Sequence, residues 1–387
     1  MSGERLKLLI LGGYGTFGGR LARLLADEPR LTLIIAGRSA AKAAAFCRAL
    51  PARVETRATG FDRDGDVEAQ LRAIAPDLVV DASGPFQSYG DEPYRLVTAC
   101  VALGIDYLDL ADGAGFVTGI GAFDAAARAQ GVFILSGASS YPVLTAAVAR
   151  ELAQGLARVD AITAGIAPSP YAGIGLNVVR AIAFYAGKPV TLIRDGRPAI
   201  GYALTEARRY TIAPPGRRPL GNIRFSLVDV PDLQVLPDLW PDLRAIWMGV
   251  GPVPEILHRA LNGLAWLVRL GLLPSLLPFA RLFHFAINRL RWGEHRGGMF
   301  VAIEGASADG TKLTRSWHLL AEGDDGPFIP SMAAAAIIRH VLDGRRPAPG
   351  ARPAVRDVEL ADYAALFAQR AIHTGRREEL GWRAPKC

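Results

Sequence analysis

The sequence contains few cysteines, and none is spaced for a metal site or a disulfide framework. Of its 387 residues only Cys47, Cys100 and Cys387 are cysteines, and no C-x-x-C pair occurs. An odd count without paired spacing excludes a disulfide-stapled secreted scaffold and a zinc ribbon. The N-terminal MSGERLK has no room for a signal peptide. We therefore expect a cytoplasmic location, and a length of 387 residues favours two domains.

Several catalytic signatures are also missing. No tyrosine is followed four residues later by lysine, which argues against a short-chain reductase of the Tyr/Lys type. The six histidines show no H-E-x-x-H or other paired spacing, so we predict no metal site. A G-x-S-x-G nucleophile elbow is absent as well, which leaves a hydrolase without support.

Acidic residues are scarce in one segment, which is both basic and apolar. Between Ile256 and Arg296 a single acid, Glu294, accompanies six arginines, and this segment supplies +5 of the net charge of +7: Arg259, Arg269, Arg281, Arg289, Arg291 and Arg296. No aromatic-interleaved basic strand or recognition helix accompanies these arginines, so we predict no nucleic-acid partner. The longest uncharged stretch, Leu270 to Ala280, has 11 residues, against the ~20 that a transmembrane helix needs.

Three interpretations of residues 256–291 stay open. The segment could form the interface of a homodimer, a lipophilic lid over an active site, or a peripheral membrane surface with snorkelling arginines. Long apolar helices are more often buried against protein, which favours the homodimer over the membrane.

A glycine-rich turn near the N-terminus is the most informative stretch that is present. Leu8 to Arg23 reads as a strand, a tight turn and a helix, and it matches G-x-G-x-x-G. We expect Gly13 to allow the sharp turn, Gly15 to let a pyrophosphate approach the backbone, and Gly18 to let the helix pack on the strand. The candidate dinucleotide loop comprises Gly13, Tyr14, Gly15, Thr16, Phe17 and Gly18.

The end of the second predicted strand indicates which dinucleotide binds. Residues 31–36 form this strand, and Arg38 and Ser39 follow where an NAD site usually places an acid. A guanidinium and a hydroxyl suit a 2′-phosphate, so we predict NADP(H). Alternatively, Ser39 only caps the next helix and Arg38 is solvated. Asp62, after the third strand, is predicted beside the adenine, or else it caps the helix that follows.

Strands alternate with helices through residue 138, which predicts a parallel, doubly wound α/β sheet of the Rossmann type. From 139 to 387 the strands are joined by loops rich in proline and glycine. We therefore expect a Rossmann domain at 1–138 and a second α+β domain, with an antiparallel or mixed sheet, at 139–387.

These residues resemble the saccharopine dehydrogenase/reductase-like NADP-binding family. The resemblance rests on GGYGTFG (12–18), AGRS (36–39), SGPFQSYG (83–90), ACVALGIDYLDLADG (99–113), SGASSYP (136–142) and GDDGPFIP (323–330). It implies that Ser83, Gly84, Pro85 and Phe86 lie beside the cofactor, and that helix 333–342 packs back on the nucleotide domain. The chain departs from the family at residues 111–113, Ala-Asp-Gly, where many relatives have Thr-Gly-Glu in a loop that faces the active-site cleft. Lysine biosynthesis itself is not implied.

The catalytic candidates are Asp109, Asp112 and Tyr141, which follow strands at the sheet edge where ligands bind. Asp109 could instead bond backbone in its own loop, and Asp112 could stabilise the turn into Gly113. We expect an NADP(H)-dependent oxidoreductase that reduces a C=N or activated C=C bond of a small or lipophilic substrate. The alternative is a non-catalytic NADP-binding protein that associates with a membrane.

Overall fold

The structure is a computed structural model that describes residues 5–51, 53–173, 175–252, 254–289 and 293–380. The chain divides into two compact units. The first contains Met1–Leu144 and Phe328–Val358, and the second contains Thr145–Pro327 and Glu359–Cys387. The first unit thus continues past residue 138 and includes a late segment of the chain.

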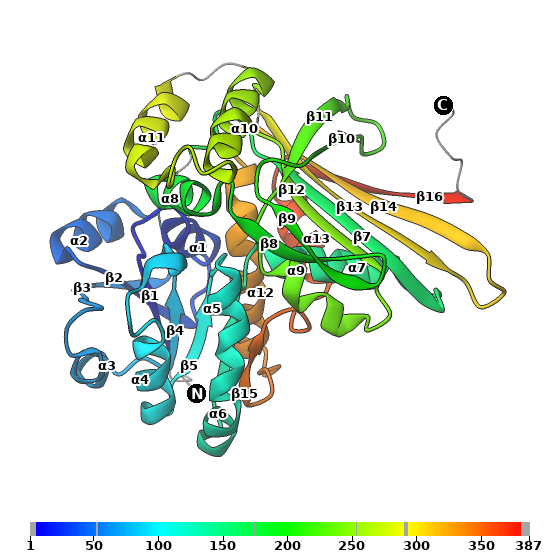
Figure 1. Ribbon diagram of the computed structural model, residues 1–387. Coiled ribbons are helices and arrows are strands. Elements are labelled where there is room, and N and C mark those ends of the chain that lie inside the picture. Colours follow the sequence, from blue (N-terminus) through cyan, green and yellow to red (C-terminus); the bar gives the residue numbers. More distant parts are fainter. Residues whose placement is uncertain (1–4, 52, 174, 253, 290–292, 381–387) are drawn as a thin grey trace. The chain divides into compact units, whose positions relative to one another are not determined.

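A parallel sheet forms the centre of the first unit, in the strand order β15-β6-β5-β4-β1-β2-β3 (Figure 1). Its described strands are β1 (Leu6–Leu11), β2 (Leu31–Gly37), β3 (Glu55–Gly60), β4 (Leu78–Asp81), β5 (Asp106–Asp109), β6 (Phe133–Ser136) and β15 (Gly350–Pro353). The order reverses between β1 and β4, which is the topological switch point of a doubly wound fold. Strands β1 and β4 are buried because helices cover the sheet, which explains their uninterrupted apolar sequences.

The helices of this unit are α1 (Gly18–Leu24), α2 (Ala40–Ala49), α3 (Val67–Ile74), α4 (Arg95–Leu103), α5 (Ala114–Gly119), α6 (Asp124–Gln130) and α12 (Ile329–Leu342). Three short helical turns, η1 (Phe86–Ser88), η2 (Ile120–Phe123) and η3 (Ser140–Leu144), lie in its loops.

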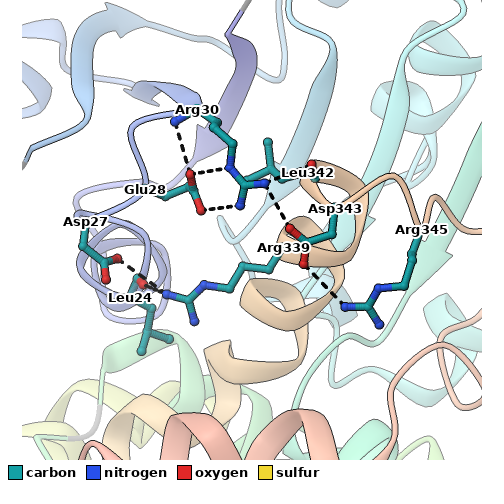
Figure 2. Close-up of polar contacts among 8 residues, drawn as sticks. All are labelled: Leu24, Asp27, Glu28, Arg30, Arg339, Leu342, Asp343 and Arg345. Carbon is teal, nitrogen blue, oxygen red and sulfur yellow. Dashed lines mark hydrogen bonds and ion pairs between the residues drawn. The ribbon is translucent and has the colours of Figure 1, made fainter. Parts of the chain in front are cut away.

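Helix α12 comes from late in the sequence and packs on α1, which follows the glycine turn. Arg339 donates to the backbone oxygen of Leu24 at 2.9 Å and pairs with Asp27 (Figure 2). A cation at that position satisfies the end of α1 and its negative dipole. Arg30 similarly bonds the backbone oxygen of Leu342 at 3.1 Å. These contacts hold the late segment 328–358 in the nucleotide-binding half.

The second unit is built on a mixed sheet in the order β10-β11-β12-β7-β13-β14-β16, in which only β12 and β7 pair in parallel. Its strands are β7 (Arg158–Ala167), β10 (Ala207–Ile212), β11 (Leu220–Leu227), β12 (Ala245–Val250), β13 (Arg296–Ala306), β14 (Lys312–Glu322) and β16 (Ile372–Leu380), and β8 (Pro189–Arg194) and β9 (Arg197–Tyr202) form a separate hairpin. Its helices are α7 (Thr145–Leu152), α8 (Leu176–Tyr185), α9 (Asp232–Val235), α10 (Glu255–Arg269), α11 (Ala280–Arg289) and α13 (Leu360–Ala368).

The predicted fold class is confirmed: a parallel Rossmann-type sheet is followed by a unit with a mixed sheet. Within the described ranges no helix combines the length and the apolarity needed to cross a bilayer.

Candidate functional site

The turn after β1 is a tight glycine turn packed against the loop after β4. Gly12 has a φ of +70°, and a Cβ on it would lie 2.7 Å from the backbone oxygen of Ala82. The left-handed residue is therefore Gly12, one position before Gly13, to which the sequence assigned the sharp turn. A Cβ on Gly18 would lie 2.4 Å from the Gly12 oxygen, so α1 can begin only where there is no side chain. This packing brings the loops after β1 and β4 together.

Backbone donors in this turn fit a pyrophosphate. The N–H of Gly13 donates to Ala36 and that of Gly15 donates to Gly12. No described residue accepts from the N–H groups of Thr16 and Phe17, which precede the first residue of α1. Such donors at the start of a helix suit the oxygens of a pyrophosphate.

Tyr14 links the glycine turn to the end of β2. Its hydroxyl oxygen accepts from the backbone N–H of Ser39 at 3.1 Å, and its ring lies so close to Gly37 that a Cβ there would be 2.7 Å away. Ser39 caps α2 by accepting from the N–H of Lys42 at 3.3 Å, as its structural interpretation predicted. Its own hydroxyl proton is still available for a ligand, and Arg38 is exposed. The capping role and the phosphate-binding role of Ser39 are thus compatible.

Asp62 is exposed and organises its own loop. Its Oδ1 accepts from the N–H of Asp64 at 3.1 Å, and its backbone N–H donates to Gln70. The residue that caps α3 is Asp66, which accepts from Ala69 at 2.9 Å. The capping alternative therefore belongs to Asp66, and a contact of Asp62 with adenine stays a prediction.

A buried ion pair fixes the loop after β4. Asp81 is fully buried, and its Oδ2 accepts from Arg63 at 2.6 Å. Ser83 donates to Oδ1 of the same carboxylate, and the guanidinium of Arg63 lies 3.5 Å from the centre of the Tyr89 ring. The sequence analysis did not identify Arg63 or Tyr89. The available signal was the acid that ends the buried strand Leu-Val-Val-Asp, since a buried carboxylate requires a cationic or hydrogen-bonding partner.

Phe86 lies in the same loop, and its side chain packs into the protein. Its ring centre is 4.9 Å from that of Tyr89 and 5.0 Å from that of Phe116 on α5. Together with Gly84 and Pro85 it forms the segment that the family resemblance associates with the cofactor. The aromatic packing holds this segment beside the glycine turn.

Asp109 joins the loops after β5 and β6. Its Oδ1 accepts from the backbone N–H groups of Ala111 and Gly137, at 2.9 and 2.7 Å, and from the hydroxyl of Ser136 at 2.9 Å. Its Oδ2 is buried and has no partner among the described residues. Burial raises the pKa of Asp109 to about 7, although the three hydrogen bonds oppose this shift. Asp109 thus supports the loops, as its structural interpretation proposed, and also carries a proton near neutral pH.

Asp112 follows Asp109 by one turn of the loop and contacts the loop after β4. The side-chain amide of Gln87 donates to Asp112 Oδ1 at 3.0 Å, while burial raises the pKa of the carboxyl group. The other amide atom, Gln87 Oε1, is buried without a partner in the described part of the chain. After an amide rotation it can accept a proton from neutral Asp112, so Gln87 suits both protonation states. Tyr141 is buried in η3, beyond the loop that Asp109 organises.

His318, considered as a donor from the second domain, is held within that unit's sheet. Its Nδ1 accepts from the N–H of Ala213 at 3.2 Å and its Nε2 contacts Ser316 at 3.0 Å, while burial lowers its pKa to about 4. The described residues hold no cluster of His, Cys, Asp and Glu that could bind a metal ion.

The arrangement at this sheet edge agrees with the family comparison. Residues 8–135 match the model of the saccharopine dehydrogenase NADP binding domain. This part of the chain is a saccharopine dehydrogenase NADP-binding domain. The family resemblance and the cofactor class, NADP(H), are thereby confirmed, and an NADP-dependent oxidoreductase is supported. No curated protein shows a significant match to this chain.

Solved structures support the fold over the whole chain. Apo saccharopine dehydrogenase (L-Glu forming) from Saccharomyces cerevisiae aligns with 97% of this chain and 100% of its own, at 14% identity and a TM-score of 0.63. A probable dehydrogenase from Thermotoga maritima covers 89% of this chain and 91% of its own, at 10% identity and a TM-score of 0.44. Biliverdin reductase from Synechocystis covers 94% and 98%, at 14% identity and a TM-score of 0.37. At these identities the similarity concerns the fold alone.

Proposed function

We propose that this protein is an NADP(H)-dependent oxidoreductase that reduces a C=N or activated C=C bond of a small or lipophilic substrate. The observation that carries the proposal is the edge of the first sheet. There a saccharopine dehydrogenase-type NADP loop is packed on the loop after β4, and two carboxyl groups with raised pKa values follow β5. Hydride transfer requires a positioned cofactor and a group that carries a proton, and both are present at this edge.

The chain's own residues would contribute binding and proton transfer. The N–H groups of Thr16 and Phe17 suit the pyrophosphate, and Arg38 and Ser39 suit the 2′-phosphate. When bound, NADPH supplies the hydride to the unsaturated carbon. Asp112 would hold the proton that neutralises the reduced substrate, with Gln87 orienting its carboxyl group.

The raised pKa of Asp112 favours this role. A carboxyl group that stays partly protonated near neutral pH can act as a general acid, and such catalysis typically contributes ~10² to 10⁴ in rate. Asp109 and Tyr141 stay candidates for the same role. Oδ1 of Asp109 is engaged by three donors, so it can exchange a proton only through Oδ2.

The test is NADPH oxidation with a panel of cyclic imines and α,β-unsaturated carbonyl compounds of increasing chain length. Asp112→Asn should keep the Kd for NADPH and lower kcat at least ~30-fold, since it removes a group that acts mainly in the transition state. Asp195→Asn is the matched control, because Asp195 lies in an exposed turn of the second unit at a φ of +50°, which asparagine also tolerates.

A kcat for Asp112→Asn within a few-fold of the control would remove Asp112 from the mechanism and direct the same test to Asp109 and Tyr141. Tight NADPH binding without oxidation by any substrate of the panel would favour the second candidate, a non-catalytic NADP-binding protein associated with a membrane. The observation that favours this candidate is the exposed apolar surface of the second unit.

A further inference from the structure

Helix α10 buries its polar side and exposes its apolar side. The buried positions are His258, Asn262 and Ala265, spaced four and three residues apart. Asn262 accepts from Arg224 at 3.1 Å and bonds Ser226 on β11, so the inner side of the helix is held by polar contacts. Burial lowers the pKa of His258 to about 4, which keeps its imidazole neutral.

The opposite side of α10 carries large apolar residues in contact with solvent. Ile256 is 63% exposed, Trp266 is 41% exposed and Leu270, the residue after the helix, is 64% exposed. In most surface helices the apolar stripe faces the core. Here that stripe faces outward, so packing within this unit does not account for it.

The connection to α11 and the outer side of α11 have the same character. Leu272 and Phe279 in the connection are 68% and 44% exposed, and Leu282 and Phe285 on α11 are 61% and 64% exposed. Figure 1 shows α10 and α11 as consecutive helices of the second unit, joined by this segment. Of the large apolar residues that are exposed in the described ranges, all but Phe184 and Ile200 fall between 256 and 285.

The charges on this surface have one sign. From Ile256 to Arg289 the sequence contains four arginines, Arg259, Arg269, Arg281 and Arg289, and no acid. Arg281 and Arg289 are exposed and share the outer side of α11 with Leu282 and Phe285, at helical spacing. Arg269 stacks on Trp266, with its guanidinium carbon 4.5 Å from the ring centre. Arginine and tryptophan together are typical of helices that lie at a lipid–water interface.

We propose that the outer surface of α10, η5 (Leu277–Phe279) and α11 docks on an anionic lipid bilayer, lying in the interface without crossing it. The apolar side chains enter the boundary between head groups and acyl chains, and the arginines bind lipid phosphates. Anionic lipid supplies both the apolar surface and the opposite charge that this surface requires.

A second copy of the chain fits this surface less well. In a two-fold interface the same patch contributes from both partners, so Arg281 and Arg289 would face their own equivalents. No acid between 256 and 289 could neutralise them. Like charges brought together in this way oppose association, whereas a phosphate surface attracts them.

The test is co-sedimentation of the full chain with vesicles, without cofactor or substrate, so that its result is independent of the proposed reductase activity. One vesicle contains equal parts of phosphatidylglycerol and phosphatidylcholine, and the other contains phosphatidylcholine alone. The variant Arg281→Glu/Phe285→Glu changes the outer side of α11. The matched control, Arg197→Glu/Ile200→Glu, makes the same exchange at exposed positions of β9.

The wild type should bind the anionic vesicles, release them as salt is added, and bind phosphatidylcholine weakly. The α11 variant should lose at least ~30-fold in partitioning, from about fivefold for each change of charge and the lost apolar insertion, whereas the β9 control binds like the wild type. Retained NADPH binding and an unchanged circular dichroism spectrum show that the variant is folded.

Three results would overturn the proposal: no binding to anionic vesicles, equal loss in the β9 control, or unchanged binding by the α11 variant. Concentration-dependent self-association that ignores lipid and is abolished by Arg281→Glu/Phe285→Glu would also overturn it, in favour of a homodimer.

Discussion

Stability of the first unit should depend on pH through Asp109. This carboxyl group is fully buried, and its pKa of about 7 lies well above the ~3.9 of an aspartate in an unfolded chain. Between those two values the folded protein keeps a proton that the unfolded chain has released. The free energy of unfolding therefore falls as pH rises, and the stabilising contribution is complete only below the unfolded value.

The size of this effect follows from the two pKa values. Each pH unit within the window costs up to ~1.4 kcal/mol, and integration from pH 5 to pH 8 gives a loss of roughly 2–3 kcal/mol. In Asp109→Asn the amide cannot ionise, so this slope disappears. Asparagine Oδ1 can still accept from Ala111, Ser136 and Gly137, but its NH2 group replaces the unpartnered Oδ2, at a pH-independent cost of ~1–3 kcal/mol.

The measurement is urea unfolding by circular dichroism at pH 5, 6, 7 and 8. All six tryptophans lie in the second unit, so tryptophan fluorescence follows that unit separately. The wild type should exceed Asp109→Asn in stability by roughly 2–3 kcal/mol more at pH 5 than at pH 8. Asp124→Asn is the control, because Arg128 lowers the pKa of Asp124 and the group stays ionised over the whole range. A constant difference between wild type and Asp109→Asn would refute the reasoning.

Two further predictions concern the cofactor and the loop after β4. Arg38→Glu should weaken NADPH roughly ten- to a hundredfold and leave NADH nearly unchanged, because it replaces the cation expected at the 2′-phosphate by a like charge; fluorescence titration of both cofactors measures this, and an equal loss for both contradicts it. Arg63→Met should cost ~3 kcal/mol in urea unfolding because it leaves Asp81 buried without its cation. The double variant with Asp81→Asn should recover part of that loss, and a cost below ~1 kcal/mol for Arg63→Met would argue against the ion pair.

The Rossmann half was predictable because its signals are local. A buried parallel strand is a short apolar run, and a dinucleotide turn is a fixed spacing of glycines, so β1, β2 and β4 could be read within a residue or two. The seventh strand could not be read in this way. β15 is only Gly-Ala-Arg-Pro, and it becomes a strand because it pairs with the edge strand β6 across more than two hundred residues of sequence.

Side-chain partners in the site were less predictable than the backbone positions. The sequence identified Asp109 and Asp112, but not that Gln87 contacts Asp112 or that Arg63 neutralises Asp81. Both partners come from a different loop of the sheet edge, and no spacing along the chain records which loops meet. The left-handed turn at Gly12 was missed for a related reason, since the G-x-G-x-x-G spacing does not include the glycine before it.

The orientation of α10 shows most clearly what a pattern of residues leaves open. Its periodicity predicts an amphipathic helix, but the same pattern arises whether the apolar side packs on protein or faces outward. The decision depends on β11, where Arg224 and Ser226 offer hydrogen bonds that Asn262 can complete and that a leucine could not. A buried guanidinium without such a partner would be costly, so the polar side turns inward and the apolar side is exposed as a consequence. The outward surface of α10 is thus a property of the sheet beneath it, and it makes a lipid contact available without any change of fold.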